Sequence, residues 1–84
     1  METLKLDHPV TVDGVEVTEL RVRRPKVRDR LAVEKGGGSD AEKEHRLLAN
    51  LAEVTPKTLE ELDLADYLRL QEVLQGFLSP RLPS

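Results

Sequence analysis

Hydrophobic and polar residues alternate through the first quarter of the chain, on both sides of Asp13-Gly14. A period of two is typical of strands with one buried face, and Asp-Gly is a favoured two-residue turn because it accepts positive φ. The pattern predicts an antiparallel β-hairpin over residues 3–23. Its pairs next to the turn are expected to be Val12 with Val15 and Val10 with Val17.

The alternation changes phase in the second predicted strand, where the apolar residues move from odd to even positions after Val17. One extra residue near Thr18-Glu19 restores the phase and places Leu6 opposite Val22. We therefore expect a β-bulge or a strand break at Thr18-Glu19. Pro9 cannot donate a hydrogen bond to a ladder, so we expect it at an edge or a bend.

Helical signals follow the hairpin and predict three helices, over about residues 25–35, 40–54 and 58–78. Pro25 suits the first turn of the first helix, whose apolar face is weak. The glycines at 36–38 end this helix, and the entropy cost of ordering them predicts a flexible connector over residues 36–39. Residues 79–84 contain two prolines and are also predicted to be flexible.

The second and third helices have recognisable starts. Ser39 or Asp40 can cap the second helix. Thr58 and Glu61 have the spacing of a capping box, and Asp63 can cap the last part of the third helix. The predicted fold class is α+β, an N-terminal antiparallel β-hairpin followed by three helices. We expect the middle and last helices to pack on one face of the hairpin.

The 84 residues are enough for one small domain, 1–84, without a deep catalytic cleft. The absence of cysteine excludes disulfides, thiolate catalysis and cysteine-based zinc sites. The N-terminus has no basic start followed by an apolar run, and no segment approaches the roughly 20 apolar residues that span a bilayer. These features predict a soluble intracellular protein.

The net charge of −3 conceals two regions of opposite sign. Residues 21–30 carry six basic side chains and one acidic, whereas residues 40–78 carry nine acidic and four basic. The favoured interpretation of the basic run is the solvated face of a strand. The second interpretation is contact with an acidic protein surface, through Arg21, Arg23, Arg24, Lys26 and Arg28.

The third interpretation is a small nucleic-acid-binding regulator that uses residues 21–30 on phosphates. Tyr67 and Phe77 are the only aromatic residues, which leaves almost nothing for base stacking. The segment also has no Asn, Gln or Ser beside its arginines for reading base edges. We therefore expect no nucleic-acid partner, and keep this function as the alternative.

Candidate catalytic and metal-binding groups have simpler explanations. The glycine run is not followed by the lysine and hydroxyl that a phosphate-binding loop needs. His8 and His45 have no second ligand at zinc-binding spacing. The acidic pairs, Glu60-Glu61 and Asp63 with Asp66, stand at predicted helix starts, where they offset the helix dipole. We expect no enzymatic activity, no metal and no cofactor.

The closing helix has an unusually wide apolar arc. Its members are Leu64, Tyr67, Leu68, Leu70, Val73, Leu74, Phe77 and Leu78. The residues opposite are Asp66, Arg69, Glu72 and Gly76. The arc exceeds the roughly 100° that suffices for one core. We expect a core seam around Leu70, Leu74 and Phe77, and margins at Leu64, Leu68 and Val73. The arc is predicted to bind a partner through these margins, either another subunit or a helical client. An anionic membrane is disfavoured because the polar face has one cation.

Three segments, in this order, resemble the tail assembly chaperones of contractile-tailed phages, the family that includes the Mu-like tail assembly proteins. They are VTELRVRRPKVRD, RLLANLAEVTPKTLEEL and LDLADYLRLQEVLQGFL. In that family a strand ending in Thr-Glu-Leu leads through a charged stretch and a proline into a helix. The chain ends in a helix that begins Leu-Asp-x-x-Asp-Tyr. The glycine run at 36–38 departs from the family pattern.

The resemblance implies a function that composition does not show. Such chaperones are made in the host cytoplasm, keep the long helical tape measure protein soluble and promote polymerisation of the tail tube protein around it. They are absent from the finished virion, and many of their genes also give a longer product by frameshifting. The resemblance supplies no catalytic residues. We expect the chain to bind these two proteins and to form a homo-oligomer.

Overall fold

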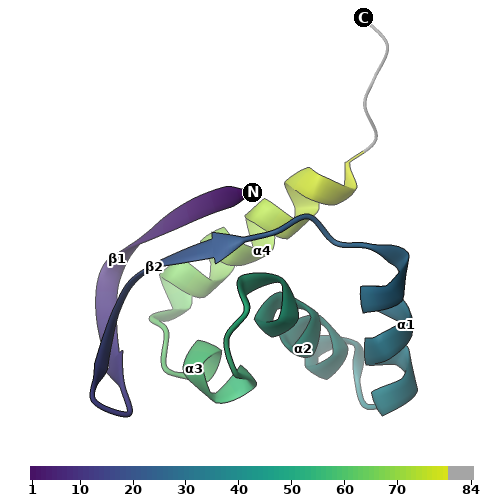
Figure 1. Cartoon of the computed structure of the whole chain (residues 1–84), viewed down its shortest axis with the longest axis horizontal. Coiled ribbons are helices and arrows are strands. Elements are labelled where there is room, and N and C mark those ends of the chain that lie inside the picture. Colours follow the sequence, from purple (N-terminus) through teal and green to yellow (C-terminus); the bar gives the residue numbers. More distant parts are fainter. Residues whose placement is uncertain (80–84) are drawn as a thin grey trace, which may run out of the picture.

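A two-stranded antiparallel sheet and four helices make up the computed structural model, which describes residues 1–79 (Figure 1). The strands are β1 (Glu2–Val12) and β2 (Val15–Val22). The helices are α1 (Val27–Gly36), α2 (Asp40–Ala52), α3 (Pro56–Glu60) and α4 (Leu64–Leu78). The α+β class and the N-terminal hairpin are confirmed. The flexibility expected beyond Ser79 concerns residues outside the described part.

The turn of the hairpin forms where the sequence predicts it. Asp13 and Gly14 have φ angles of 51° and 79°, the positive values that a two-residue hairpin turn requires. Val12 pairs with Val15, and Val10 pairs with Val17, as expected. Local sequence alone therefore specifies the register at the tip.

The register changes further along the hairpin, but on the other strand from the one expected. Pairing is interrupted between Lys5 and Val10 and resumes with Leu4 opposite Leu20. The segment Leu6–Pro9 of β1 thus faces the single residue Thr18. The bulge predicted at Thr18-Glu19 and the pairing of Leu6 with Val22 are both wrong. There are two physical reasons. Pro9 has no N–H to donate to β2, and two other N–H groups of this segment donate to a carboxylate of α4.

The core lies between the inner face of the sheet and the helices. Its buried side chains are Leu4, Leu6, Leu20, Val22, Leu48, Ala49, Leu51, Ala52, Leu59, Leu62, Leu70 and Leu74. Helix α4 contacts β1 and α2 contacts β2, which confirms that the last and middle helices pack on the hairpin. Helix α1 packs on α2, at the end of the molecule opposite the hairpin tip (Figure 1).

Short side chains cap three of the four helices. Ser39 accepts the N–H of Glu42 at the start of α2. Thr55, with Pro56 in the first turn, caps α3, so the capping box expected from Thr58 and Glu61 does not form. Asp63 caps α4 as expected. The helix predicted over 58–78 is therefore two helices, because Asp63 adopts an extended conformation between them.

The glycine run joins α1 to α2 by a route that few other residues could follow. Gly37 and Gly38 have φ angles of 70° and 100°. A Cβ atom on Gly36 would lie 3.3 Å from the guanidinium of Arg46. This guanidinium donates hydrogen bonds to the carbonyl oxygens of Val33 and Gly37, at the end of α1. The loop is thus fastened to α2, while its flexibility stays a prediction.

Candidate protein-binding surface

The apolar arc of α4 divides into a buried part and an exposed part. Leu70 and Leu74 are 0% and 2% exposed and belong to the core. Three further members are half-buried against the core: Tyr67, Val73 and Phe77. The other three, Leu64, Leu68 and Leu78, are 69%, 50% and 56% exposed. Only these last three therefore leave at least half of their surface free for a partner.

The exposed leucines belong to one continuous stripe along α4. The sequence separations from Leu64 through Leu68, Gln71 and Gln75 to Leu78 are four, three, four and three residues. This spacing keeps side chains on one side of a helix and is the seam spacing of coiled coils. Gln75 is exposed and Gln71 is half-buried. We call these five residues the α4 stripe.

A hollow of about 720 Å³ lies at the start of the α4 stripe, between α2, α3 and α4. Its apolar lining comes from Leu59, Leu62, Leu64 and Tyr67. Charged side chains of Glu42, Arg46 and Glu60 stand at the same hollow. A leucine-sized side chain of a partner would find apolar walls here and a partly acidic rim.

One wall of this hollow is held in place by hydrogen bonds to His45. Its Nε2 lies 2.9 Å from the carbonyl oxygen of Pro56, and its Nδ1 lies 2.9 Å from the hydroxyl of Tyr67. A carbonyl only accepts, so Nε2 donates, and a neutral imidazole accepts the Tyr67 proton at Nδ1. Burial and, to a smaller extent, Glu44 raise the pKa of Tyr67, which keeps that proton in place. His45 thereby links α2, α3 and α4.

A second hollow, of about 420 Å³, lies at the end of the α4 stripe, between α1, α2 and α4. Its apolar lining is Pro25, Val27, Val33, Leu47 and Leu78. Nearby, the guanidinium of Arg24 lies 5.2 Å from the ring centre of Phe77, a cation–π contact, and donates to the Phe77 carbonyl. The stripe therefore runs from one hollow to the other.

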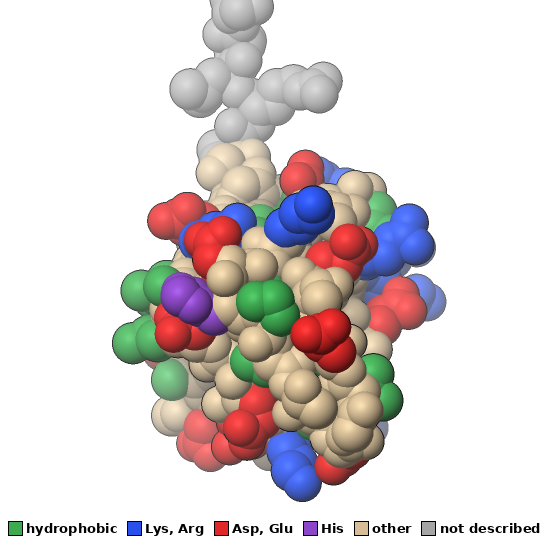
Figure 2. Space-filling model, turned by 90° about the vertical axis from the view of Figure 1, so that its left-hand side faces the viewer, with side chains coloured by type: hydrophobic (Ala, Val, Ile, Leu, Met, Phe, Trp, Pro, Cys, Tyr) green, Lys and Arg blue, Asp and Glu red, His purple; other side chains and the backbone are tan. Residues whose placement is uncertain are grey.

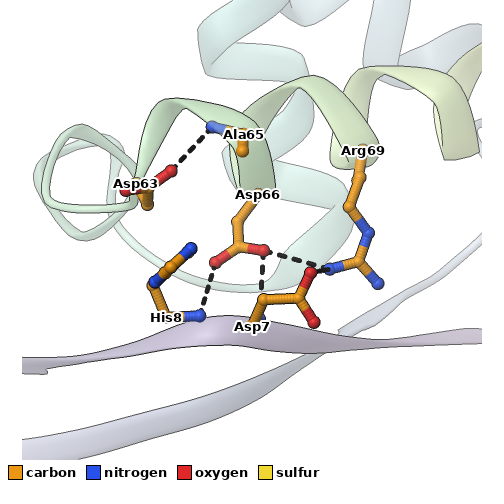
Figure 3. A network of polar contacts seen from close by, with 6 residues as sticks. All are labelled: Asp7, His8, Asp63, Ala65, Asp66 and Arg69. Atoms are coloured by element: carbon orange, nitrogen blue, oxygen red, sulfur yellow. Dashed lines mark hydrogen bonds and ion pairs between the residues drawn. The ribbon is translucent and has the colours of Figure 1, made fainter.

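Asp66 fastens α4 to the bulge of β1 (Figure 3). Its carboxylate accepts the backbone N–H groups of Asp7, at 3.1 Å, and His8, at 3.0 Å. Arg69 donates to the same carboxylate at 3.0 Å and also lies 3.2 Å from the Asp7 carboxylate. These contacts orient α4 on the sheet and so determine which of its faces remains exposed.

The position of Asp66 differs from the expectation. The sequence predicts that Asp66 lies on the polar, solvent-facing side of α4, as an acidic residue near the helix start. Its side chain is instead 0% exposed. Burial opposes its ionisation, but the two N–H groups and Arg69 outweigh that effect and lower the pKa of Asp66. Asp66 holds α4 on β1, a strand that is distant in the sequence. Within α4, the only sequence signal for this role is the spacing of three residues between Asp66 and Arg69.

The basic segment does not form one free surface. Arg23 donates two hydrogen bonds to Asp29, at 2.9 and 2.7 Å, and Arg24 is engaged with Phe77. The Arg23 guanidinium, followed by the N–H of Lys26, holds the pKa of Asp29 far below its usual value despite burial. Among the five candidate cations, Arg21, Lys26 and Arg28 are exposed and make no ion pair within residues 1–79.

The hairpin side of the molecule shows no broad region of one charge. Acidic and basic side chains are interspersed there, with hydrophobic side chains scattered between them (Figure 2). Within residues 1–79, no three His, Cys, Asp or Glu side chains are grouped as metal ligands, and no helix is long and apolar enough to cross a membrane. The exposed leucines of α4, in contrast, lie along one stripe of a single helix.

A comparison with protein families agrees with this picture. The family model for phage tail assembly chaperone proteins, described as E, or 41 or 14, matches residues 3–79. Neither the curated proteins nor the solved structures gave a match. The family match covers the hairpin, all four helices and the α4 stripe. This chain therefore belongs to the phage tail assembly chaperone family.

Proposed function

We propose that this protein keeps the tape measure protein soluble before the tail tube forms, and that it promotes assembly of the tube protein around it. The protein acts by binding, without catalysis, in the host cytoplasm, and leaves before the virion is complete. Family membership supports a role in tail assembly. The observation that carries the finer proposal is the α4 stripe, with its three exposed leucines.

The stripe suits a helical client. A helix with apolar residues at alternating spacings of three and four would lie along α4 as in a coiled coil. Two of its apolar side chains would enter the hollows beside Leu64 and Leu78. The glutamines between them favour a client with a polar residue at that level, which would set the register.

Release follows from the small size of this contact. A few leucines on one short helix give weak binding per copy, since standard stable interfaces bury about 1,600 Å². A long client offers many such segments, so several copies bound along it gain stability through avidity. Tube subunits that form a larger contact with the same segments would displace the chaperone copy by copy.

Co-expression with the tape measure protein tests this proposal. We expect the natural chain to raise the soluble fraction of the client severalfold, and Leu68→Glu to abolish this effect because a carboxylate then lies in the seam. Leu64→Glu should act in the same way. Both residues are at least half exposed, so these variants should remain folded by circular dichroism.

Val15→Glu is the matched control. Val15 is 64% exposed, close to the 69% of Leu64, but lies at the hairpin turn, away from α4. This variant should solubilise the client as well as the natural chain does. Full activity of folded Leu64→Glu and Leu68→Glu proteins would exclude the α4 stripe as the client surface.

A further inference from the structure

The two hollows lie along the same face of α4. Tyr67 lines the first hollow and Leu78 the second, and they are 11 residues apart, which is about three helical turns. Their side chains therefore leave the helix in nearly the same direction, towards α2, which also lines both hollows. A helix that lies along the α4 stripe would thus meet two apolar depressions about 16 Å apart.

A carboxylate stands between the two hollows on the α2 side. Glu44 lines the second hollow, and its charge also contributes to the raised pKa of Tyr67 in the first. Glu44 is half-buried and makes no ion pair within residues 1–79. Gln71 of the α4 stripe lies between Tyr67 and Leu78 on the same face of α4. The middle of the stripe is therefore polar, with a negative charge beside it.

A second carboxylate stands on the other flank of the α4 stripe. Glu72 is exposed, and it too makes no ion pair among the residues that the structure describes. Arg69 shares this flank but is held by Asp66 at 3.0 Å and by Asp7 at 3.2 Å. A helix bound on the stripe would therefore pass between Glu44 and Glu72.

The cations near the hollows are engaged or lie farther out. Arg46, at the first hollow, donates to two carbonyl oxygens at the end of α1. Lys43, at the second hollow, pairs with Glu34 at 2.9 Å. Lys26 and Arg30 line the second hollow from α1, and α2 separates α1 from α3 (Figure 1). These two cations would meet a client beyond its second apolar side chain, and not between the two.

We propose that the client segment bound here carries lysine or arginine between two apolar side chains, all on one face of a helix. The apolar side chains enter the two hollows, and the basic side chains reach Glu44 and Glu72. Charge complementarity selects this pattern, because acidic residues at the middle of the client segment would face two like charges. This inference rests on the proposed function and names the chemistry of the segment that the stripe binds.

Two designed peptides test the proposal on the purified chain. Each is an alanine-rich helix of about 20 residues, with four seam positions spaced as in the α4 stripe and leucine at the outer two. The inner two are lysine in one peptide and glutamate in the other. In NMR titrations of the isotopically labelled chain, the lysine peptide should shift the amide signals of both hollows and bind more tightly by roughly fivefold or more.

A third peptide is the control for the position of the leucines. It has the composition of the lysine peptide, but its second leucine is moved to the opposite face of the helix. It should bind more weakly and leave the signals of one hollow unshifted. Equal affinities of the lysine and glutamate peptides, or no shift with the lysine peptide at roughly millimolar concentration, would overturn the proposal.

The variant Glu44→Lys tests which carboxylate selects the charge. It should weaken binding of the lysine peptide and strengthen binding of the glutamate peptide, each by roughly two- to fivefold. Glu16→Lys makes the same change of net charge at an exposed position near the hairpin turn, and should alter neither affinity. Circular dichroism checks that both variants are folded. Natural affinities in a folded Glu44→Lys protein would contradict the role of Glu44.

The result can be separated from that of the proposed function. Solubilisation of the tape measure protein depends on the α4 stripe and should fail for Leu68→Glu whatever charges the client carries. If it does fail while the two peptides bind equally, the proposed function stands and this inference is wrong. Shifts of the same signals when the chain is concentrated without peptide would assign the hollows to a second copy, and would also overturn the inference.

Discussion

The carboxylate of Asp66 in α4 accepts the backbone N–H of His8 at 3.0 Å, across 58 residues of sequence. The neighbouring N–H of Asp7 donates to the same carboxylate. Both N–H groups lie in the segment where β1 leaves the register of β2, so a side chain of a helix completes the hydrogen bonding of the sheet.

Replacing Asp66 by Asn should destabilise the fold. An amide has one acceptor oxygen in place of two, so one of the N–H groups of Asp7 or His8 would face an NH₂ group. We expect the midpoint of thermal unfolding to fall by about 5 °C or more. Glu72→Gln, an exposed change on the same helix, is the control and should leave the midpoint unchanged within about 1 °C.

Low pH should destabilise the protein through two carboxylates. The pKa values of Asp29 and Asp66 are lowered in the folded protein, and the ordinary value for an aspartate is 3.8. Their contribution is therefore complete above about pH 4 and is lost as the pH falls below it, because folding then requires the release of protons. The free energy of unfolding of Asp29→Asn, followed by urea titration, should fall less steeply between about pH 4 and pH 2. An unchanged slope would contradict the ion pair between Arg23 and Asp29.

The two sides of α4 should respond differently to the same change. Leu74→Ala removes a core side chain that is 2% exposed, and we expect a loss of about 2–5 kcal/mol in the free energy of unfolding. Leu68→Ala alters a half-exposed side chain and should cost less than about 0.5 kcal/mol. Urea unfolding measures both. Equal losses would mean that α4 is rotated relative to the core.

Glycine-to-alanine changes should have opposite signs at two positions. Gly38 has a φ of 100°, and its Cβ would lie 3.3 Å from Glu42, so Gly38→Ala should destabilise the fold by about 1 kcal/mol or more. Gly76 lies within α4 with nothing within 4 Å of a Cβ, so Gly76→Ala should stabilise it by about 0.5–1 kcal/mol. Thermal and urea unfolding should rank the variants accordingly.

Features that depend on neighbouring residues were predictable from the sequence. The hairpin turn follows from the backbone freedom of Asp13-Gly14, and the pairs next to it follow from geometry. The caps at Ser39 and Asp63 follow from short polar side chains ahead of apolar runs. In each case one or two residues settle the local hydrogen bonding, and the tertiary structure agrees with them.

Features that depend on distant residues were not predictable. The strand that carries the bulge is decided by Asp66, which offers acceptors to β1 and not to β2. The width of the apolar arc on α4 was apparent, but which margin stays exposed depends on how Asp66 and Arg69 orient the helix on the sheet. Val73 consequently packs against the core, whereas Leu78 does not.

The hydrogen bonds from Asp7 and His8 to Asp66 also bear on the order of folding. Among the described residues, strand β1 is synthesised first and helix α4 last. Asp66 is 59 residues from Asp7 and 58 residues from His8 in the sequence. Contacts over such separations close a long loop and are expected to form late. The hairpin can therefore pair at its tip early, while the N–H groups of its bulged segment gain their acceptor only when α4 packs on the sheet. Premature release of a shortened chain would leave those two N–H groups without their acceptor.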